Sequence, residues 1–482
     1  MLATIDMGSN SFRLQIGEYR DNRIRVVTVA REPNRLAAGL DKKNMLSDGA
    51  IKNGLDALRR LRAILDAHPI SAVRAVATNT LRIAVNSPGF LAQAEKVLGY
   101  PIEVISGEEE GRLVYLGVAN LLADAAERRL VVDIGGGSTE MILGEGVQVK
   151  RADSFNIGTV KQSLSFFSDG VISASHFDLA FLSARSYFRE ISSHYGPHHW
   201  AAAYGSSGTI RSLAEIMVAN QIGDGRLTYD NLNTLRKELI AFGKMGKVQL
   251  NGLRQERTAS IIGGLTILTV LMQELNMPVM NTVASGLRMG LMWDLCLQSL
   301  SYDRREQSIA HFMTQYRIEK KRAVQTAEYA CSLFDTLSPN SDFRRYVHWG
   351  ALAHEAGLFV SPAQYHKHGA YLIQHADLAG FTMREQKYMA QIVRFQKDSV
   401  TRDILTERSD LLKAVLSLRL AILFRNAGVS DDIRLLRVHA KKRVDVTIPR
   451  AWTKQYPVLS FSLRQESGLW DEAGVHMQVH EE

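Results

Sequence analysis

The sequence predicts an α/β protein with two similar lobes around a cleft, followed by an all-α domain and a small β-rich tail. A strand–turn–strand pattern occurs twice, 127 residues apart. Strand and helix patterns alternate as far as about residue 299, and little strand pattern follows before residue 430. We therefore expect lobes over 1–123 and 124–299, a helical domain over 300–430 and a β-rich domain over 431–482.

The repeat is the strongest of these observations. Residues 5–18 read IDMGSNSFRLQIGE and residues 132–145 read VDIGGGSTEMILGE, with five of 14 positions identical. Each copy follows a short apolar run and continues into alternating apolar residues, which is typical of a β-hairpin with small residues at its tip. Two such hairpins a domain length apart predict two similar lobes that face each other.

The remaining elements of the lobes follow from hydrophobic periodicity. In the first lobe we expect strands at 25–30, 72–77 and 102–106 and helices at 47–67, 87–98 and 108–123. In the second we expect strands at 130–133, 139–143, 147–152, 200–204 and 282–284 and helices at 171–194, 208–220, 255–276 and 286–299. The polar segment 299–308 marks the next boundary, and the tail has strand patterns at 433–440, 443–448, 457–463 and 475–480.

Composition places few limits on function. The chain has 482 residues, of which 46% are hydrophobic, so it can bury substantial cores and is not expected to be disordered. No apolar run approaches the roughly 18 residues of a membrane span, and we expect no stable membrane insertion. Two cysteines, Cys296 and Cys331, fit a reducing cytoplasm. The net charge of +8 is too small to require a nucleic acid, and none is expected as a partner.

The turn from Asp133 to Thr139 has the composition of a phosphate cradle. Glycines let backbone N–H groups approach an anion closely, and successive N–H groups form a nest for its oxygens. A tight turn alone is the alternative, but such a turn needs only one glycine. No Gly-Lys-Ser/Thr follows, so this is not a P-loop. The predicted phosphate-binding residues here are Gly135, Gly136, Gly137, Ser138 and Thr139.

Three further turns are rich in small residues. The first is the tip of the first hairpin, with an arginine two residues further on the outgoing strand. The second follows an apolar strand and opens a helix, whose positive end suits an anion. The third, at 156–159, is a weaker signal. Together they predict phosphate binding by Gly8, Ser9, Asn10, Ser11, Arg13, Gly158, Gly205, Ser206, Ser207, Gly208 and Thr209.

Acidic residues stand among these anion sites. Asp133 and Glu140 flank the glycine turn, and two carboxylates would repel a phosphate unless a divalent cation lay with them. Magnesium, or another divalent cation, fits because it binds one or two carboxylates together with phosphate oxygens and water. A run of three glutamates opens the helix after Gly107. We interpret Glu108 and Glu109 as helix-start residues and expect Glu110 to face the cleft.

These motifs resemble the exopolyphosphatase / guanosine pentaphosphate phosphohydrolase family, on the actin-like (ribonuclease H-like) fold. The resemblance rests on IDMGSNSFRL, ATNTLRIA, ISGEEEGRL, VVDIGGGSTE, GSSGTIRSL and SGLRMGL, in that order over about 300 residues. It implies that Glu110 orients or deprotonates the attacking water and that Asp133 and Glu140, with Asp6 as the first-turn carboxylate, are associated with magnesium. It further implies that Arg13, Arg82 and Arg288 hold phosphates, and that the protein is a homodimer.

The second half resembles the helical domain of the family's longer members, which is similar to metal-dependent HD phosphohydrolases. Five histidines fall between 348 and 375, namely His348, His354, His366, His368 and His375. An HD site needs a His-Asp dipeptide, whereas this chain has His354-Glu355. We therefore expect a degenerate, structural HD-like domain.

The function expected from the sequence is hydrolysis of terminal orthophosphate from linear inorganic polyphosphate, with magnesium and a water positioned by Glu110. The alternative is removal of the 5′-phosphate from guanosine pentaphosphate by the same machinery. A non-hydrolytic alarmone sensor and a sugar-kinase-like phosphotransferase are hypotheses from other classes. The sensor would lack one of Glu110, Asp133 and Glu140, and all three are present.

Overall fold

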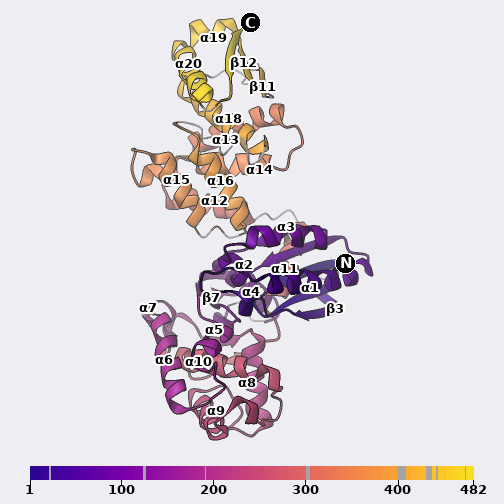
Figure 1. Cartoon of the computed structure of the whole chain (residues 1–482). Helices are drawn as coiled ribbons and strands as arrows, with labels where there is room; N and C mark the ends of the chain where they lie inside the picture. Colours follow the sequence, from indigo (N-terminus) through magenta and orange to yellow (C-terminus); the bar gives the residue numbers. More distant parts are fainter. Residues whose placement is uncertain are drawn as a thin grey trace. The chain divides into compact units, whose positions relative to one another are not determined.

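The computed structural model describes the chain apart from residues 21–22, 123–125, 190, 300–303, 377, 379, 399–408, 430–436, 441–442 and 473. It divides into two compact units, Met1–Tyr302 and Asp303–Glu482 (Figure 1). The expected boundaries at 123/124 and 430/431, and much of the expected boundary segment 299–308, lie outside the described residues.

The first lobe contains a five-stranded sheet in the order β3-β2-β1-β4-β5. Its strands are β1 (Leu2–Met7), β2 (Ser11–Arg20), β3 (Arg23–Pro33), β4 (Ala72–Ala77) and β5 (Ile102–Val104). β1, β2 and β3 pair antiparallel, whereas β4 and β5 continue parallel to β1. The sheet is packed by α1 (Asp48–Asp66), α2 (Asn79–Ile83) and α3 (Ser87–Leu98), and one core runs through strands and helices.

The second lobe repeats this topology. Its sheet has the order β10-β9-β6-β7-β8 and the same pattern of antiparallel and parallel pairs. The strands are β6 (Arg128–Ile134), β7 (Thr139–Glu145), β8 (Gln148–Phe155), β9 (Ala202–Gly205) and β10 (Asn281–Thr282). The prediction of two similar α/β lobes is therefore confirmed.

The helices of the second lobe gather around a core helix that is apolar on every face, α10 (Thr258–Glu274) (Figure 1). The others are α5 (Thr159–Phe166), α6 (Ala174–Tyr187), α7 (Ser192–Tyr195), α8 (Gly208–Ala219) and α9 (Tyr229–Phe242). Of these, α5 and α9 were not among the helices expected from the sequence.

Two helices cross between the lobes. α4 (Gly107–Ala119) follows a strand of the first lobe but packs on β7 and β8 of the second. α11 (Leu287–Ser299) follows a strand of the second lobe but packs on β1 and β2 of the first. The two helices also pack closely on each other, because a Cβ atom at Gly290 would overlap the Leu113 carbonyl. Each lobe is therefore completed by a helix from the other.

The repeat includes the two glycines on which these crossing helices pack. In both lobes the register between the second and third strands of the sheet shifts, between Ile16 and Gly17 of β2 and between Leu143 and Gly144 of β7. A Cβ atom at Gly17 would lie 3.1 Å from the Met292 sulfur on α11, and one at Gly144 would overlap the Tyr115 ring on α4. The matching glycines therefore make room for the crossing helices.

In the residues that the structure describes, the second compact unit begins with six α-helices, which confirms the prediction of an all-α region. These are α12 (Arg304–Gln315), α13 (Lys320–Leu337), α14 (Arg344–Ala353), α15 (Tyr365–His375), α16 (Met383–Arg394) and α18 (Ser409–Asn426). A small sheet, β11-β12-β13, follows with β11 (Arg437–Ala440), β12 (Val444–Ile448) and β13 (Met477–Glu481). Within the described residues, no helix combines the length and the apolar character that crossing a bilayer requires.

One strand expected in the tail is wrong. Residues 457–463 begin α20 (Pro457–Glu472), which follows α19 (Arg450–Gln455). The alternation of Leu459, Phe461 and Leu463 resembles a strand, but Phe461 is exposed while the two leucines are buried. The buried set continues with Glu466 and Trp470, at helical rather than strand spacing.

Candidate active site

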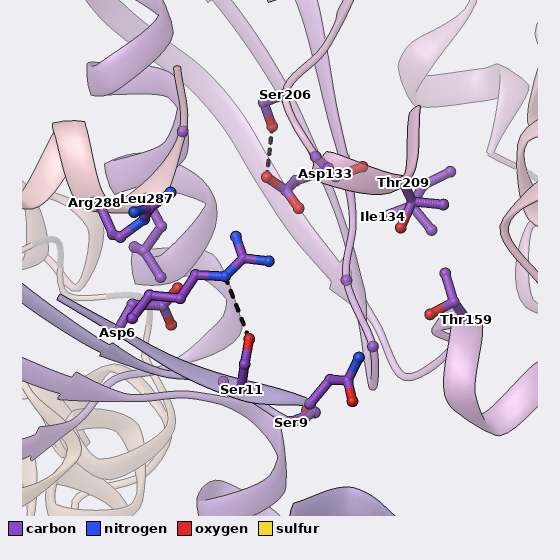
Figure 2. A pocket seen from close by; sticks show the side chains of 18 of the residues that line it. Asp6, Ser9, Ser11, Asp133, Ile134, Thr159, Ser206, Thr209, Leu287 and Arg288 are labelled. Carbon is purple, nitrogen blue, oxygen red and sulfur yellow. Dashed lines mark hydrogen bonds between the residues drawn. The ribbon is translucent and has the colours of Figure 1, made fainter. Parts of the chain in front are cut away.

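A cavity of about 800 Å³ lies where the turns of the two lobes meet. Figure 2 shows Asp6, Ser9 and Ser11 of the first lobe and Asp133, Ser206 and Thr209 of the second around it. Of the residues predicted from the sequence, its wall contains Asp6, Gly8, Ser9, Asn10, Ser11, Arg13, Glu110, Asp133, Gly135, Gly136, Gly137, Ser138, Ser206, Ser207, Gly208, Thr209 and Arg288. The structure thus brings together residues from five separate motifs.

Five predicted residues do not line the cavity. Thr139 donates a hydrogen bond of 2.7 Å to the Ile157 carbonyl. A Cβ atom at Gly158 would lie 2.5 Å from the backbone of Gly136, so this glycine allows the turn to pack. A Cβ atom at Gly205 would lie 2.5 Å from the Ile210 side chain on α8, so this glycine also allows close packing. These three residues shape the turns. The other two are Arg82, which lies beside Glu110, and Glu140, which pairs with Asp133 across the second hairpin.

The glycine turn is held by its own backbone. The Gly135 N–H donates to the Ser138 carbonyl at 2.9 Å, and the first N–H groups of α5 donate to the carbonyls of Gly135 and Gly136. A Cβ atom at Gly137 would overlap the Asn79 side chain of the first lobe. The turn therefore needs glycine where it meets the opposite lobe.

The helix that begins after Ser207 points its N-terminal end at the cavity wall. Ser207 caps α8 by accepting a hydrogen bond from the Ile210 N–H at 3.2 Å. The preceding Ser206 hydroxyl donates to Asp133 Oδ2 at 2.6 Å (Figure 2). The free N–H groups of the first turn suit an anion, as the sequence predicts.

Two carboxylates stand directly opposite each other on the second hairpin. Asp133 of β6 pairs in register with Glu140 of β7. Glu140 is buried and accepts a hydrogen bond from the Ser154 hydroxyl at 2.9 Å. Burial, followed by the charge of Asp133, raises the pKa of Glu140 to about 7. Like charges facing each other across a strand pair are unfavourable, so this arrangement is suited to a cation.

Glu110 lies in the first turn of α4 beside this pair. Its side chain is 13% exposed, and Arg82 Nη1 is 3.5 Å from Glu110 Oε2. Arg82 is itself fixed by donating to the Ile105 carbonyl at 2.9 Å. Burial, followed by the charge of Glu140, raises the pKa of Glu110 well above its usual range. Its Oε2 atom is buried without a hydrogen-bond partner, as a general base free to accept a proton would be.

Asp6, the third residue predicted as a metal ligand, has a different environment. It stands opposite Arg13 in the first hairpin. Burial raises the pKa of Asp6, while the charges of Arg13 and Arg288 act in the opposite direction. Across the strand pair Asp6 therefore faces an arginine, whereas Asp133 faces another carboxylate and is influenced more weakly by the charges of Arg13 and Arg211 than by burial.

Further arginines that the sequence analysis did not single out line the same cavity. Arg31 stands directly opposite Arg13, and the Nε atoms of both donate to the Ser11 hydroxyl, at 3.3 and 3.4 Å. Arg211 and Arg257 line the wall on the second lobe. The hairpin register could have identified Arg31, and Arg211 falls inside the motif GSSGTIRSL.

Some of these guanidinium groups are held close together. Burial, followed by the charge of Arg13, lowers the pKa of both Arg257 and Arg288. Arg257 is anchored by donating to the Ser212 hydroxyl at 2.7 Å. Such a cluster of like charges is suited to an anion with several charged groups.

Glu109 lies in the first turn of α4, as expected from the sequence, and it also forms a buried ion pair. It is 1% exposed and is held by both Nε and Nη2 of Arg112, at 2.6 and 2.7 Å. The acidic run after Gly107 therefore divides between a buried ion pair and the cavity wall.

The carboxylates fit a cation that is shared with a ligand rather than a closed metal cage. In the part of the chain that the structure describes, no group of three or more His, Cys, Asp and Glu side chains could hold a metal ion. However, burial and neighbouring carboxylates raise the pKa values of Glu110, Asp133 and Glu140, and a cation beside them would favour their charged forms. Magnesium needs only one or two carboxylates when phosphate oxygens and water complete its shell.

The histidines of the helical unit do not form such a site either. His354 is fully buried, and its Nε2 atom lies 3.1 Å from Arg425 Nη1. Glu355 accepts from Arg322 at 2.8 Å and pairs with Arg425 at 3.2 Å. Burial lowers the pKa of His354 to about 4. The guanidinium group of Arg425 thus contacts both residues that replace the His-Asp dipeptide, which is consistent with the expectation of a structural domain.

Two actin-like lobes are joined by crossing helices around a cleft. The backbone donors, arginines and carboxylates that line this cleft define the site of a phosphate-processing enzyme. Residues 15–299 match the Ppx/GppA phosphatase family, and residues 304–467 match domain III of the same phosphatases. The chain belongs to this family and is a phosphatase.

Solved structures agree with this assignment. An exopolyphosphatase-like protein is 25% identical with a TM-score of 0.54, and the match covers 61% of this chain and 97% of that one. A Ppx/GppA family member from Aquifex aeolicus is 26% identical with a TM-score of 0.52, covering 62% and 98%. An exopolyphosphatase from Cytophaga hutchinsonii, 22% identical with a TM-score of 0.56 and coverage of 61% and 97%, shares the fold.

Proposed function

We propose that the chain is an exopolyphosphatase, which hydrolyses the terminal orthophosphate from linear inorganic polyphosphate. The observation that carries this proposal is the run of arginines along one cavity, which exceeds what a single terminal phosphate needs. A second cavity, of about 250 Å³, shares Arg31 and Arg257 with the first and adds Arg254. A linear polyanion would have cationic partners along both cavities.

In the proposed reaction, Glu110 acts as general base. Its carboxylate accepts a proton from a water molecule while the water oxygen attacks the terminal phosphorus. The bond from that phosphorus to the bridging oxygen breaks, and the shortened chain leaves with the additional negative charge. Phosphoryl transfer depends mainly on positioning and charge neutralisation, and the arginines and turn N–H groups of the cavity wall are suited to both.

Asp133 and Glu140 are the residues that would hold magnesium. When bound, the cation would neutralise charge on the phosphate oxygens and offset the repulsion between these two carboxylates. Asp6 faces Arg13 and Arg288 instead, so we propose that it orients these arginines or, less directly, assists the same cation.

Guanosine pentaphosphate 5′-phosphohydrolase is the second candidate function. That substrate also has a terminal phosphate and a second phosphate group at a distance, so the same cavities would accept it. Family membership is equally consistent with both substrates.

The test is orthophosphate release from long polyphosphate, guanosine pentaphosphate and ATP, measured in parallel with magnesium and with EDTA. We expect the highest kcat/KM on polyphosphate and loss of activity in chelator. Turnover of guanosine pentaphosphate alone would replace the first proposal with the second. No release from any of the three would contradict both.

A further inference from the structure

Five buried or half-buried charged side chains form a connected cluster beside α4, outside the cavity. Arg112 donates hydrogen bonds from Nε and Nη2 to the two oxygens of Glu109, and its Nη2 also donates to Asp294 Oδ1 at 2.9 Å. Arg74 pairs with the other oxygen of Asp294 and with Glu103, the latter at 3.1 Å. The side chains of Glu109, Arg112, Arg74 and Asp294 are all at most 6% exposed.

The cluster joins three elements that meet only in the folded first unit. Glu109 and Arg112 belong to α4, Asp294 belongs to α11, and Arg74 belongs to β4. The two helices touch backbone to backbone, because a Cβ atom at Gly117 would lie 2.8 Å from the Gly290 nitrogen on α11. The ion pairs therefore add charged contacts to a close backbone contact between α4 and α11.

The cluster has a direct geometric relation to the cavity. Glu110 follows Glu109 in the first turn of α4, about 100° further around the helix. When Arg112 holds Glu109 on the side of α11 and β4, Glu110 is turned toward Arg82 and the cavity. Arg288 lies less than two turns before Asp294 on α11, so the same cluster also fixes the helix that carries this arginine.

Stability alone does not explain the cluster. A buried ionic group is often no more stabilising than well-packed apolar residues of the same volume, because each charge loses its hydration. Here Arg112 Nη1 is even left buried without a hydrogen-bond partner. What an ionic cluster adds to an apolar contact is a defined orientation.

We propose that Glu109, Arg112, Asp294 and Arg74 are positioning residues, which hold Glu110 and Arg288 in their places at the cavity. This inference rests on the proposed function, in which Glu110 is the general base. The cluster acts through the rotation of α4 and does not touch the substrate.

The test uses the full chain with Asp294→Asn, which keeps the shape of the side chain and removes its charge. We expect kcat to fall roughly tenfold through Glu110 and KM to rise by a smaller factor through Arg288, since a displacement of about 1 Å at a reacting group can cost on the order of 100-fold. Arg112→Lys, which keeps the charge but cannot grip two carboxylates, should lower kcat in the same direction and is less disruptive to folding.

The matched control is Glu466→Gln in the second unit. Glu466 forms a comparably buried ion pair with Arg419, so this variant also loses a buried charge. We expect a similar fall in melting temperature and a kcat within twofold of wild type.

A second readout does not depend on catalysis. Carbodiimide labelling followed by mass spectrometry should modify Glu110 several-fold faster in Asp294→Asn than in wild type or Glu466→Gln, because the first turn of α4 is released. Unchanged kcat and unchanged labelling in folded variants would overturn the inference. Lack of wild-type activity on any substrate, with faster labelling of Glu110 in the variant, would instead refute the proposed function and leave the positioning role intact.

Discussion

The two hairpins that form the cavity have the same backbone and opposite charges. Both carry an aspartate before the turn, and in both the second strand has a register shift where it pairs with the next strand, 127 residues apart. The partner of the aspartate across the strands is Arg13 in the first lobe and Glu140 in the second. The next strand places Arg31 opposite Arg13, but Ser154 opposite Glu140. A duplicated scaffold has therefore acquired a cationic face and an anionic face.

The crossing helices strengthen this difference. α11 brings Arg288 to the first lobe, near Asp6 and Arg13. α4 brings Glu110 to the second lobe, near Glu140. The comparison teaches that two hairpins of the same fold differ in the charges they carry, and under the proposed function the carboxylates beside Asp133 would serve water and cation chemistry while Arg13 and Arg31 would bind phosphate.

The largest expected effect comes from the anionic side. Glu110→Gln keeps the size of the side chain but removes the base, and we expect turnover to fall roughly 10²- to 10⁴-fold with little change in substrate binding. Steady-state kinetics on polyphosphate, with Glu108→Gln as the neighbouring control, measure this. Retention of more than half of wild-type turnover would show that Glu110 is not the base.

Asp133→Asn should separate cation binding from phosphate binding. A neutral amide is a poorer ligand for a hard cation, so the magnesium concentration for half-maximal activity should rise about tenfold or more. The measurement is a magnesium titration after treatment with EDTA. Full activity of the wild type in chelator would contradict a metal role for both Asp133 and Glu140.

The cationic side should respond differently. Arg13→Gln removes a charged donor and should raise KM for polyphosphate roughly tenfold, since a hydrogen bond to a charged group contributes about 1.5–3 kcal/mol. The magnesium requirement should stay unchanged. If Arg13→Gln and Asp133→Asn shift KM and the magnesium requirement alike, the division between the two hairpins is wrong.

The smallest effect concerns stability in the absence of metal. The pKa of Glu140 is raised to about 7 in the folded protein, so the folded state binds a proton that the unfolded state releases near pH 4.5. This contribution is fully present below the unfolded pKa and is lost as the pH rises through 7. In EDTA we expect the melting temperature to fall by a few degrees between pH 5 and pH 8, and Glu140→Gln to reduce that fall. Magnesium should restore stability at pH 8.

The sequence predicted the hairpins, their turns and the residues of the cavity wall because small residues and charges lie next to one another along the chain. It missed Arg31 and Arg257, which reach the cavity only through strand register and through a short 3-10 helix, Gln255–Arg257, before α10. The buried ion pair of Glu109 was not anticipated, because Arg112, which holds Glu109, is fixed in turn by Asp294, 182 residues further along the chain. In the tail, alternation over seven residues could not distinguish a strand from the first two turns of α20.

The exchange of α4 and α11 bears on how the first unit could be divided. A chain cut between the lobes would leave α4 on one fragment. The surface on which α4 packs, formed by β7 and β8 at Gly144, would remain on the other fragment. In the same way, α11 would be separated from the surface of β1 and β2 at Gly17 on which it packs. Neither fragment should fold as an independent module, yet each exposes the surface that the other recognises. The two lobes are thus a natural pair for split-protein complementation, in which phosphatase activity reports on reassembly.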